Sequence, residues 1–168
     1  IAQELVIPTK IEDEIYIKLK GFEGNTDIKK NIEDILSYNP IFVEEIIFKY
    51  IVKIEATKPN ILSHIFKILG HFDSPRCILT LAKYADPFVS TQEKSKPILR
   101  ARHLRVSAIN ALMEKVNAER AKHVIKHISD TDPLFQSIVL KLLKDKDIKE
   151  AIDPSYEAFK QPTAETNL

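Results

Sequence analysis

Four stretches of ten residues decide the fold of this chain: DIKKNIEDIL (Asp27–Leu36), NILSHIFKIL (Asn60–Leu69), HLRVSAINAL (His103–Leu112) and PLFQSIVLKL (Pro133–Leu142). When the last stretch is shifted by one residue, the apolar positions fall into four columns. The columns are Ile28, Ile61, Leu104 and Phe135; Ile32, Ile65, Ala108 and Val139; Ile35, Ile68, Ala111 and Leu142; and Leu36, Leu69, Leu112 and Leu143. This spacing predicts four amphipathic helices that each bury the same face.

The distance between successive stretches indicates a repeat. The residues of the first column are 33, 43 and 31 positions apart. The longer middle step contains a polar insertion near Asp86–Pro97. Without those roughly 12 residues the period is about 31–33 residues, within the range of helical solenoids.

Capping residues and prolines divide the rest of the chain into further helices. Thr9 and Glu12 have the spacing of a capping box, and Asn39–Pro40 places a proline at the first turn of the next long helix. The apolar run IIFKYIV (Ile46–Val52) is rich in β-branched residues, so a strand is its alternative structure. We expect helices over residues 9–20, 27–36, 40–55, 60–70, 74–85, 97–116, 117–128, 133–143 and 147–159, and a loop over 86–96. The sequence contains no β-hairpin signal of the Asn-Gly or Asp-Gly type.

Residues Leu104–Asp145 resemble HEAT repeats. In that family the second helix of a repeat commonly follows an Asp-Pro turn, carries a Val-Arg-like pair and ends in Ala-Leu. Asp132–Pro133 corresponds to the turn. In the preceding repeat, Leu104–Arg105 corresponds to the pair and Ala111–Leu112 to the end of the helix. The two earlier repeats match by apolar spacing alone.

The resemblance implies an all-α fold, a right-handed α-α superhelix of about four helix pairs plus a C-terminal helix. It also implies a scaffold or binding platform, since the motif specifies helix packing and no chemistry. We therefore divide the chain into an N-terminal linker from a larger protein (1–8), a HEAT-like repeat domain (9–160) and a disordered tail (161–168).

Composition excludes several broad classes. Lys and Arg number 25 and Asp and Glu 24, so the net charge of +1 gives no global field to attract nucleic acid or an anionic membrane. The segment IAQELVIPTK (Ile1–Lys10) is too short and too polar for a signal sequence or a membrane span. The chain starts without Met, which suggests a cut within a longer polypeptide. We expect a cytoplasmic location and no membrane insertion.

One dense basic run is the best candidate binding site. It consists of Lys94, Lys96, Arg100, Arg102, His103 and Arg105. Several of these side chains could converge on a carboxylate or phosphate, because arginine favours such bidentate partners. The alternative is structural: a solvated helix face, with Arg105 bonded to an aspartate between repeats such as Asp86.

The other reactive residues point more strongly to structure. His123 and His127 have a spacing that can hold a metal, but no third ligand is evident. Cys77, the one cysteine, lies among apolar helical residues. The first helix, with Ile15, Tyr16 and Ile17 in sequence, is rather apolar for the end of an array.

We expect a non-catalytic module that binds a protein or peptide, with possible contact to a preceding domain of the same chain, and with no cofactor or metal. Anion or nucleic-acid binding through residues 94–105 is the alternative, although the composition disfavours nucleic acid. An accessory domain of an enzyme is the second alternative.

Overall fold

The computed structural model describes residues 4–24, 26–55, 57–89 and 98–148. These residues are predominantly helical, which confirms the all-α class. The chain divides into two compact units, a first unit (Ile1–Phe72) and a second unit (Asp73–Leu168). In the part of the chain that the structure describes, no helix has both the length and the apolar character needed to cross a bilayer.

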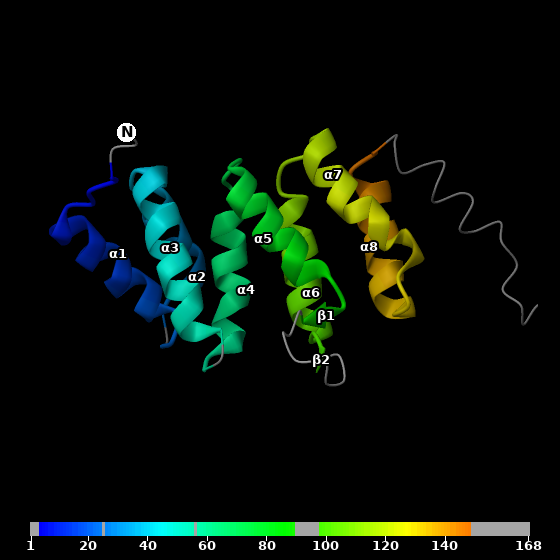
Figure 1. The fold of residues 1–168 in the computed structure, drawn as a ribbon, viewed down its shortest axis with the longest axis horizontal. Helices are drawn as coiled ribbons and strands as arrows, with labels where there is room; N and C mark the ends of the chain where they lie inside the picture. The colour runs from blue at the N-terminus through cyan, green and yellow to red at the C-terminus, as the bar shows by residue number, and fades with distance from the viewer. Residues whose placement is uncertain (1–3, 25, 56, 90–97, 149–168) are drawn as a thin grey trace, which may run out of the picture. The chain divides into compact units, whose positions relative to one another are not determined.

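The described residues of the first unit form four α-helices and one short 3₁₀ turn (Figure 1). They are α1 (Thr9–Gly21), α2 (Ile28–Leu36), α3 (Pro40–Ile54), η1 (Pro59–Ile61) and α4 (Leu62–Leu69). Helix α1 packs against α2 and α3, and both of these pack against α4.

Short polar residues start two of these helices as the sequence predicts. The side chain of Asp27 accepts a hydrogen bond from the backbone N–H of Lys30, and that of Asn39 accepts one from Ile41. The capping box predicted for α1 is wrong, because Thr9 is already inside the helix and Pro8 occupies the N-cap position.

Helix α3 forms the centre of the first unit. The run that could have been a strand is helical, and it is buried on several sides, as a helix without a polar face requires. Its buried residues are Val43, Ile46, Ile47, Phe48, Tyr50, Ile51 and Ile54.

The second unit contains four α-helices, a 3₁₀ turn and two short strands among its described residues. They are α5 (Pro75–Ala85), β1 (Phe88–Val89), β2 (Ile98–Leu99), α6 (Arg102–Leu112), α7 (Ala118–Ile125), η2 (Lys126–Ser129) and α8 (Pro133–Asp145). Helix α5 packs most extensively against α6, and α6 and α7 both contact α8.

The strands correct two sequence predictions. β1 and β2 pair antiparallel, with Phe88 opposite Leu99 and Val89 opposite Ile98, where a loop and the start of a long helix were expected. The backbone N–H of Arg100 continues this connection by donating to the carbonyl of Pro87, at 2.8 Å. Helix α6 therefore begins at Arg102 and not near residue 97.

Helix α6 is also shorter at its end than predicted. Met113 is its C-cap residue, and the next helix has its own N-cap in Asn117, whose side chain accepts a hydrogen bond from the N–H of Arg120. The few residues between these two caps form the turn, so the expected extension to residue 116 is wrong.

The four-column register agrees with the burial of each helix. All of its positions lie in α2, in η1 and α4, in α6 or in α8, and each is buried or partly buried. Asp147 follows α8, two positions after its last residue, with a backbone φ of 50°. The predicted helix over 147–159 lies almost wholly outside the described residues, and the proposed tail (161–168) lies entirely outside them.

Candidate functional site

The described members of the basic run singled out in the sequence do not form one cationic surface. Lys94 and Lys96 lie outside the described residues. Among the others, Arg100 and Arg105 are buried, whereas Arg102 and His103 are exposed. Each of the three arginines contacts groups of the second unit itself.

Arg100 contacts the end of α5. Its Nη1 donates to the carbonyl of Lys83 and, at 3.0 Å, to that of Asp86. Its guanidinium also lies 5.1 Å from the ring centroid of Tyr84. The last carbonyls of a helix lack partners within the helix and carry partial negative charge, so a cation here stabilises the C-terminus of α5.

Arg102 joins α6 to the start of α8. Its Nε and Nη2 donate to the two carboxylate oxygens of Asp132, at 2.6 and 3.1 Å. Asp132 also caps α8 by accepting from the backbone N–H groups of Leu134 and Phe135. The hydrogen bond from Arg102 is the main reason that the pKa of Asp132 lies below its ordinary value.

Arg105 forms a second and more deeply buried pair. Its Nη2 lies 2.5 Å from Oδ2 of Asp130, and its Nε donates to the carbonyl of Ala85 at 2.8 Å. The guanidinium lies 3.8 Å from the ring centroid of Phe135. An aspartate bonded to Arg105 was expected from the sequence, but it is Asp130 and not Asp86.

The pKa of Asp130 reflects this pairing. Burial alone raises the pKa of a carboxyl group. Hydrogen bonds from Arg105 and from the backbone N–H of Asp132 outweigh burial, so the pKa of Asp130 lies below its ordinary value. The carboxylate is therefore charged at neutral pH and needs the guanidinium beside it.

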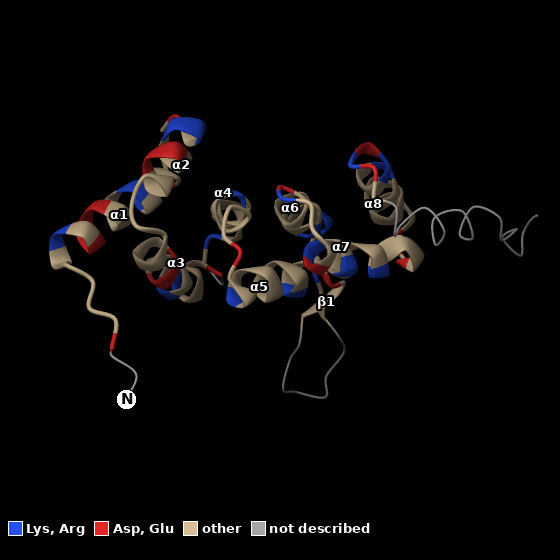
Figure 2. Cartoon of the chain, turned by 90° about the horizontal axis from the view of Figure 1, so that it is seen from above, with Lys and Arg blue, Asp and Glu red and all other residues tan. Residues whose placement is uncertain are grey.

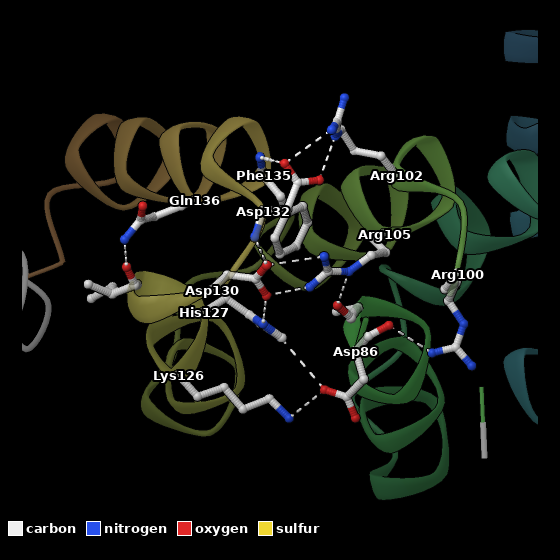
Figure 3. A network of polar contacts seen from close by, with 12 residues as sticks. Asp86, Arg100, Arg102, Arg105, Lys126, His127, Asp130, Asp132, Phe135 and Gln136 are labelled. Atoms are coloured by element: carbon white, nitrogen blue, oxygen red, sulfur yellow. Dashed lines mark hydrogen bonds and ion pairs between the residues drawn. The ribbon is translucent and has the colours of Figure 1, made fainter. Parts of the chain in front are cut away.

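His127 extends the same network (Figure 3). Its Nδ1 lies 3.2 Å from Oδ2 of Asp130, and its ring is perpendicular to that of Phe135 at 5.4 Å between centroids. Its Nε2 is buried without a hydrogen bond and lies 3.8 Å from Oδ1 of Asp86, which Lys126 also approaches at 2.9 Å. Burial lowers the pKa of His127 and outweighs the hydrogen bond to Asp130.

These contacts join α5, α6, η2 and α8. They give Arg100, Arg102 and Arg105 a structural role, because each of them bonds to groups of neighbouring elements. The pair His123 and His127 does not form a metal site with other ligands, since the described residues contain no group of three or more metal-binding side chains. Cys77 has no exposed surface and belongs to the core.

A different feature of the first unit has the character of a binding surface. The α1/α3 groove is an open depression of about 520 Å³ lined by Asp13, Tyr16, Ile17, Lys20, Tyr50 and Lys53. The rings of Tyr16 and Tyr50 meet edge to face, with centroids 6.2 Å apart. The side chain of Ile17 is 70% exposed, so the groove leaves an aliphatic residue in water beside two aromatic ones.

Three charged side chains line the groove: Asp13, Lys20 and Lys53. Among the described residues, the side chains of Asp13, Lys20 and Lys53 form no ion pair and no hydrogen bond. Lys53 lies over the ring of Tyr16 at 5.2 Å from its centroid. Glu23, by contrast, is occupied, because it accepts from the hydroxyl of Tyr50 at 3.0 Å and pairs with Lys58 at 2.5 Å.

The charge of α1 changes sign along its length. Lys10 lies in its first turn, the acidic residues Glu12, Asp13 and Glu14 follow, and the basic residues Lys18 and Lys20 lie in its last turn. Figure 2 shows acidic and basic segments within this same helix. Of these residues Asp13 and Lys20 line the groove, so the lining of α1 is acidic at Asp13 and basic at Lys20.

Comparisons with protein-family models, with curated proteins and with solved structures found no match to this chain.

The sequence did not reveal the aspartates that bind the arginines or the position of the groove. Asp132 was considered only as part of an Asp-Pro turn, and Asp130 was not singled out, although two carboxylates beside a helix start could have indicated partners for Arg102 and Arg105. For the groove, the signal was the unusually apolar first helix, and Ile17 is indeed exposed there.

Proposed function

We propose that this chain is a non-catalytic, HEAT-like helical-repeat module of a larger cytoplasmic protein, with its helix pairs stacked in a right-handed superhelix. Its role is to bind another protein or a peptide. The four-column register supports the repeat assignment, because each amphipathic helix needs neighbours to bury its apolar face.

The observation that carries the binding role is the exposure of Ile17 beside Tyr16 and Tyr50 in the α1/α3 groove. Single exposed apolar residues are common on protein surfaces. Here the residue adjoins two aromatic rings in a depression with a charged rim, which is the anatomy of an interface: an apolar centre surrounded by polar groups.

The contacts of the arginines support the anion-binding alternative less well. Arg102 and Arg105 bind carboxylates, and Arg100 binds backbone carbonyls. An incoming phosphate would have to displace these groups. Binding through this run would weaken steeply with salt, whereas contact through an apolar centre would change little.

Selection from a random-peptide library against the immobilised chain tests the proposal. We expect selected peptides to slow hydrogen exchange in α1 and α3. Two exposed isoleucines of the first unit provide matched variants: Ile17→Gln inside the groove, and Ile41→Gln at the other end of α3, where Ile41 is 58% exposed. Selected peptides that protect only the second unit, or a library that yields no binder, would refute the proposal.

A further inference from the structure

The α1/α3 groove carries a more specific inference, which rests on the function proposed above. We propose that its occupant is an amphipathic helix of another protein, acidic at its N-terminal end and basic at its C-terminal end, lying antiparallel to α1. The inference deepens the binding role by stating the chemistry and the direction of the partner.

The shape of the groove favours a helix. The lining residues of α1 are Asp13, Tyr16, Ile17 and Lys20, which follow the spacing i, i+3, i+4, i+7 of one helix face. The opposite wall is formed by Tyr50 and Lys53 of α3, which are three positions apart and so lie on one face of that helix. The furrow between two packed helices accepts the side-chain ridge of a third helix.

The centre of the groove fixes where the partner is apolar. Tyr16 and Ile17 lie midway between Asp13 and Lys20 along α1. The buried part of Tyr50 supports them from below, and burial raises the pKa of its hydroxyl, which donates to Glu23. The aromatic surface is thereby held in one orientation, and a partner must bring aliphatic side chains to cover it.

The unpaired charges fix the direction of the partner. Asp13 and Lys20 stand at opposite ends of the α1 wall, whereas Lys53 lies over the ring of Tyr16 at the centre. None of the three has an ion-pair partner among the described residues. Seven residues separate Asp13 from Lys20, which corresponds to about 10 Å along the helix axis. An occupant with a carboxylate and a cation at the same separation can satisfy both ends.

Helix electrostatics then select one of the two directions. Carboxylates stabilise the N-terminal turn of a helix and cations its C-terminal turn. A partner helix that places its acidic N-terminal turn over Lys20 has its basic C-terminal turn over Asp13. It therefore runs antiparallel to α1 and has the pattern acid-x-x-apolar-apolar-x-x-base.

Two synthetic peptides of identical composition test the inference. One has Glu in its first turn, Leu and Ile at its centre and Lys in its last turn, and the other exchanges the Glu and Lys positions. Fluorescence anisotropy at low salt measures their affinities for the whole chain. We expect the first peptide to bind about tenfold more tightly, a difference that corresponds to several exposed charge pairs changing sign.

Variants of the chain separate this inference from the proposed function. In Asp13→Lys/Lys20→Glu the preference between the peptides should reverse, with far-ultraviolet circular dichroism confirming that the variant is folded. Equal binding of the two peptides, lost in Ile17→Gln, would overturn the stated direction but leave the binding role intact. Binding of neither peptide would overturn the stated partner chemistry. Self-association in sedimentation analysis that is lost in Ile17→Gln would also overturn it, by identifying a second copy as the occupant.

Discussion

Arg105 of α6 and Asp130, in the turn before α8, form an ion pair in the interior of the second unit: Nη2 and Oδ2 are 2.5 Å apart, and the two side chains are 3% and 4% exposed. Three residues earlier on the same helix, Arg102 pairs with Asp132 at a similar distance, but the arginine is 49% exposed. Two arginine–aspartate pairs with nearly the same connectivity thus differ mainly in burial.

The first prediction compares these two pairs. Arg105→Met should lower the free energy of unfolding by about 3–5 kcal/mol, because it leaves the carboxylate of Asp130 buried without its cation. Arg102→Met should lower it by only about 0.2–1 kcal/mol, since solvent screens that pair. Urea unfolding followed by circular dichroism measures both values.

The double variant Arg105→Met/Asp130→Asn is the control for this mechanism. It removes the uncompensated charge, so it should be more stable than Arg105→Met alone. If the double variant is as unstable as the sum of the two single changes, the stability of Arg105 comes from packing on Phe135 and not from the charge pair.

The second prediction concerns pH. The folded chain holds the pKa of His127 below its ordinary value, first through burial. The unfolded chain therefore binds a proton more readily, so stability falls as pH drops below about 6.5, the ordinary pKa of histidine, toward the lower folded value. In His127→Gln the unfolding free energy should change less between pH 7.5 and pH 5.5 than in the parent chain.

The pH dependence of stability also tests the charged groups that surround His127. Asp130 raises its pKa, whereas Lys126 and Arg105 lower it. His64 in the first unit is a parallel case: its Nδ1 is buried without a hydrogen-bond partner, and burial, followed by Lys67, lowers its pKa. An unchanged pH slope in both His127→Gln and His64→Gln would contradict the assignment of neutral histidines in the folded state.

The third prediction uses the end of α8. Asp147 adopts a φ of 50°, in the left-handed region that residues with a side chain disfavour. Asp147→Gly should therefore raise the free energy of unfolding by up to about 1 kcal/mol. Lys141→Gly, at an exposed position inside the helix, should lower it by about 0.5–1 kcal/mol. Thermal denaturation of the two variants should give shifts of opposite sign, and a destabilising Asp147→Gly would argue against strain at that residue.

Local signals in the sequence predicted much of the fold. Ser74–Pro75 and Asp86–Pro87 bracket α5 at its observed limits, because a cap and a proline each determine the backbone of their own neighbours. The apolar columns predicted which face of α4 and α6 is buried, since the helical period alone determines that face.

Contacts between distant residues could not be predicted in the same way. Arg105 precedes Asp130 by 25 residues. From the sequence alone, Asp86, Asp130 or Asp132 could have been its partner, and the packing of α6 against α8 decides between them. The pairing of β1 with β2 was missed for a related reason. The strands are two residues long and carry none of the turn residues that reveal a tight hairpin.

The affinity of a library-selected peptide for Ile17→Gln and Ile41→Gln tests the central claim of partner binding at the α1/α3 groove most directly. Both substitutions replace an exposed isoleucine of the first unit by a polar residue that helices tolerate, so neither should unfold the chain. We predict that Ile17→Gln weakens binding about tenfold or more, as for the loss of an apolar residue at the centre of an interface, while Ile41→Gln binds like the parent chain. Equal affinities for the two variants would contradict the claim.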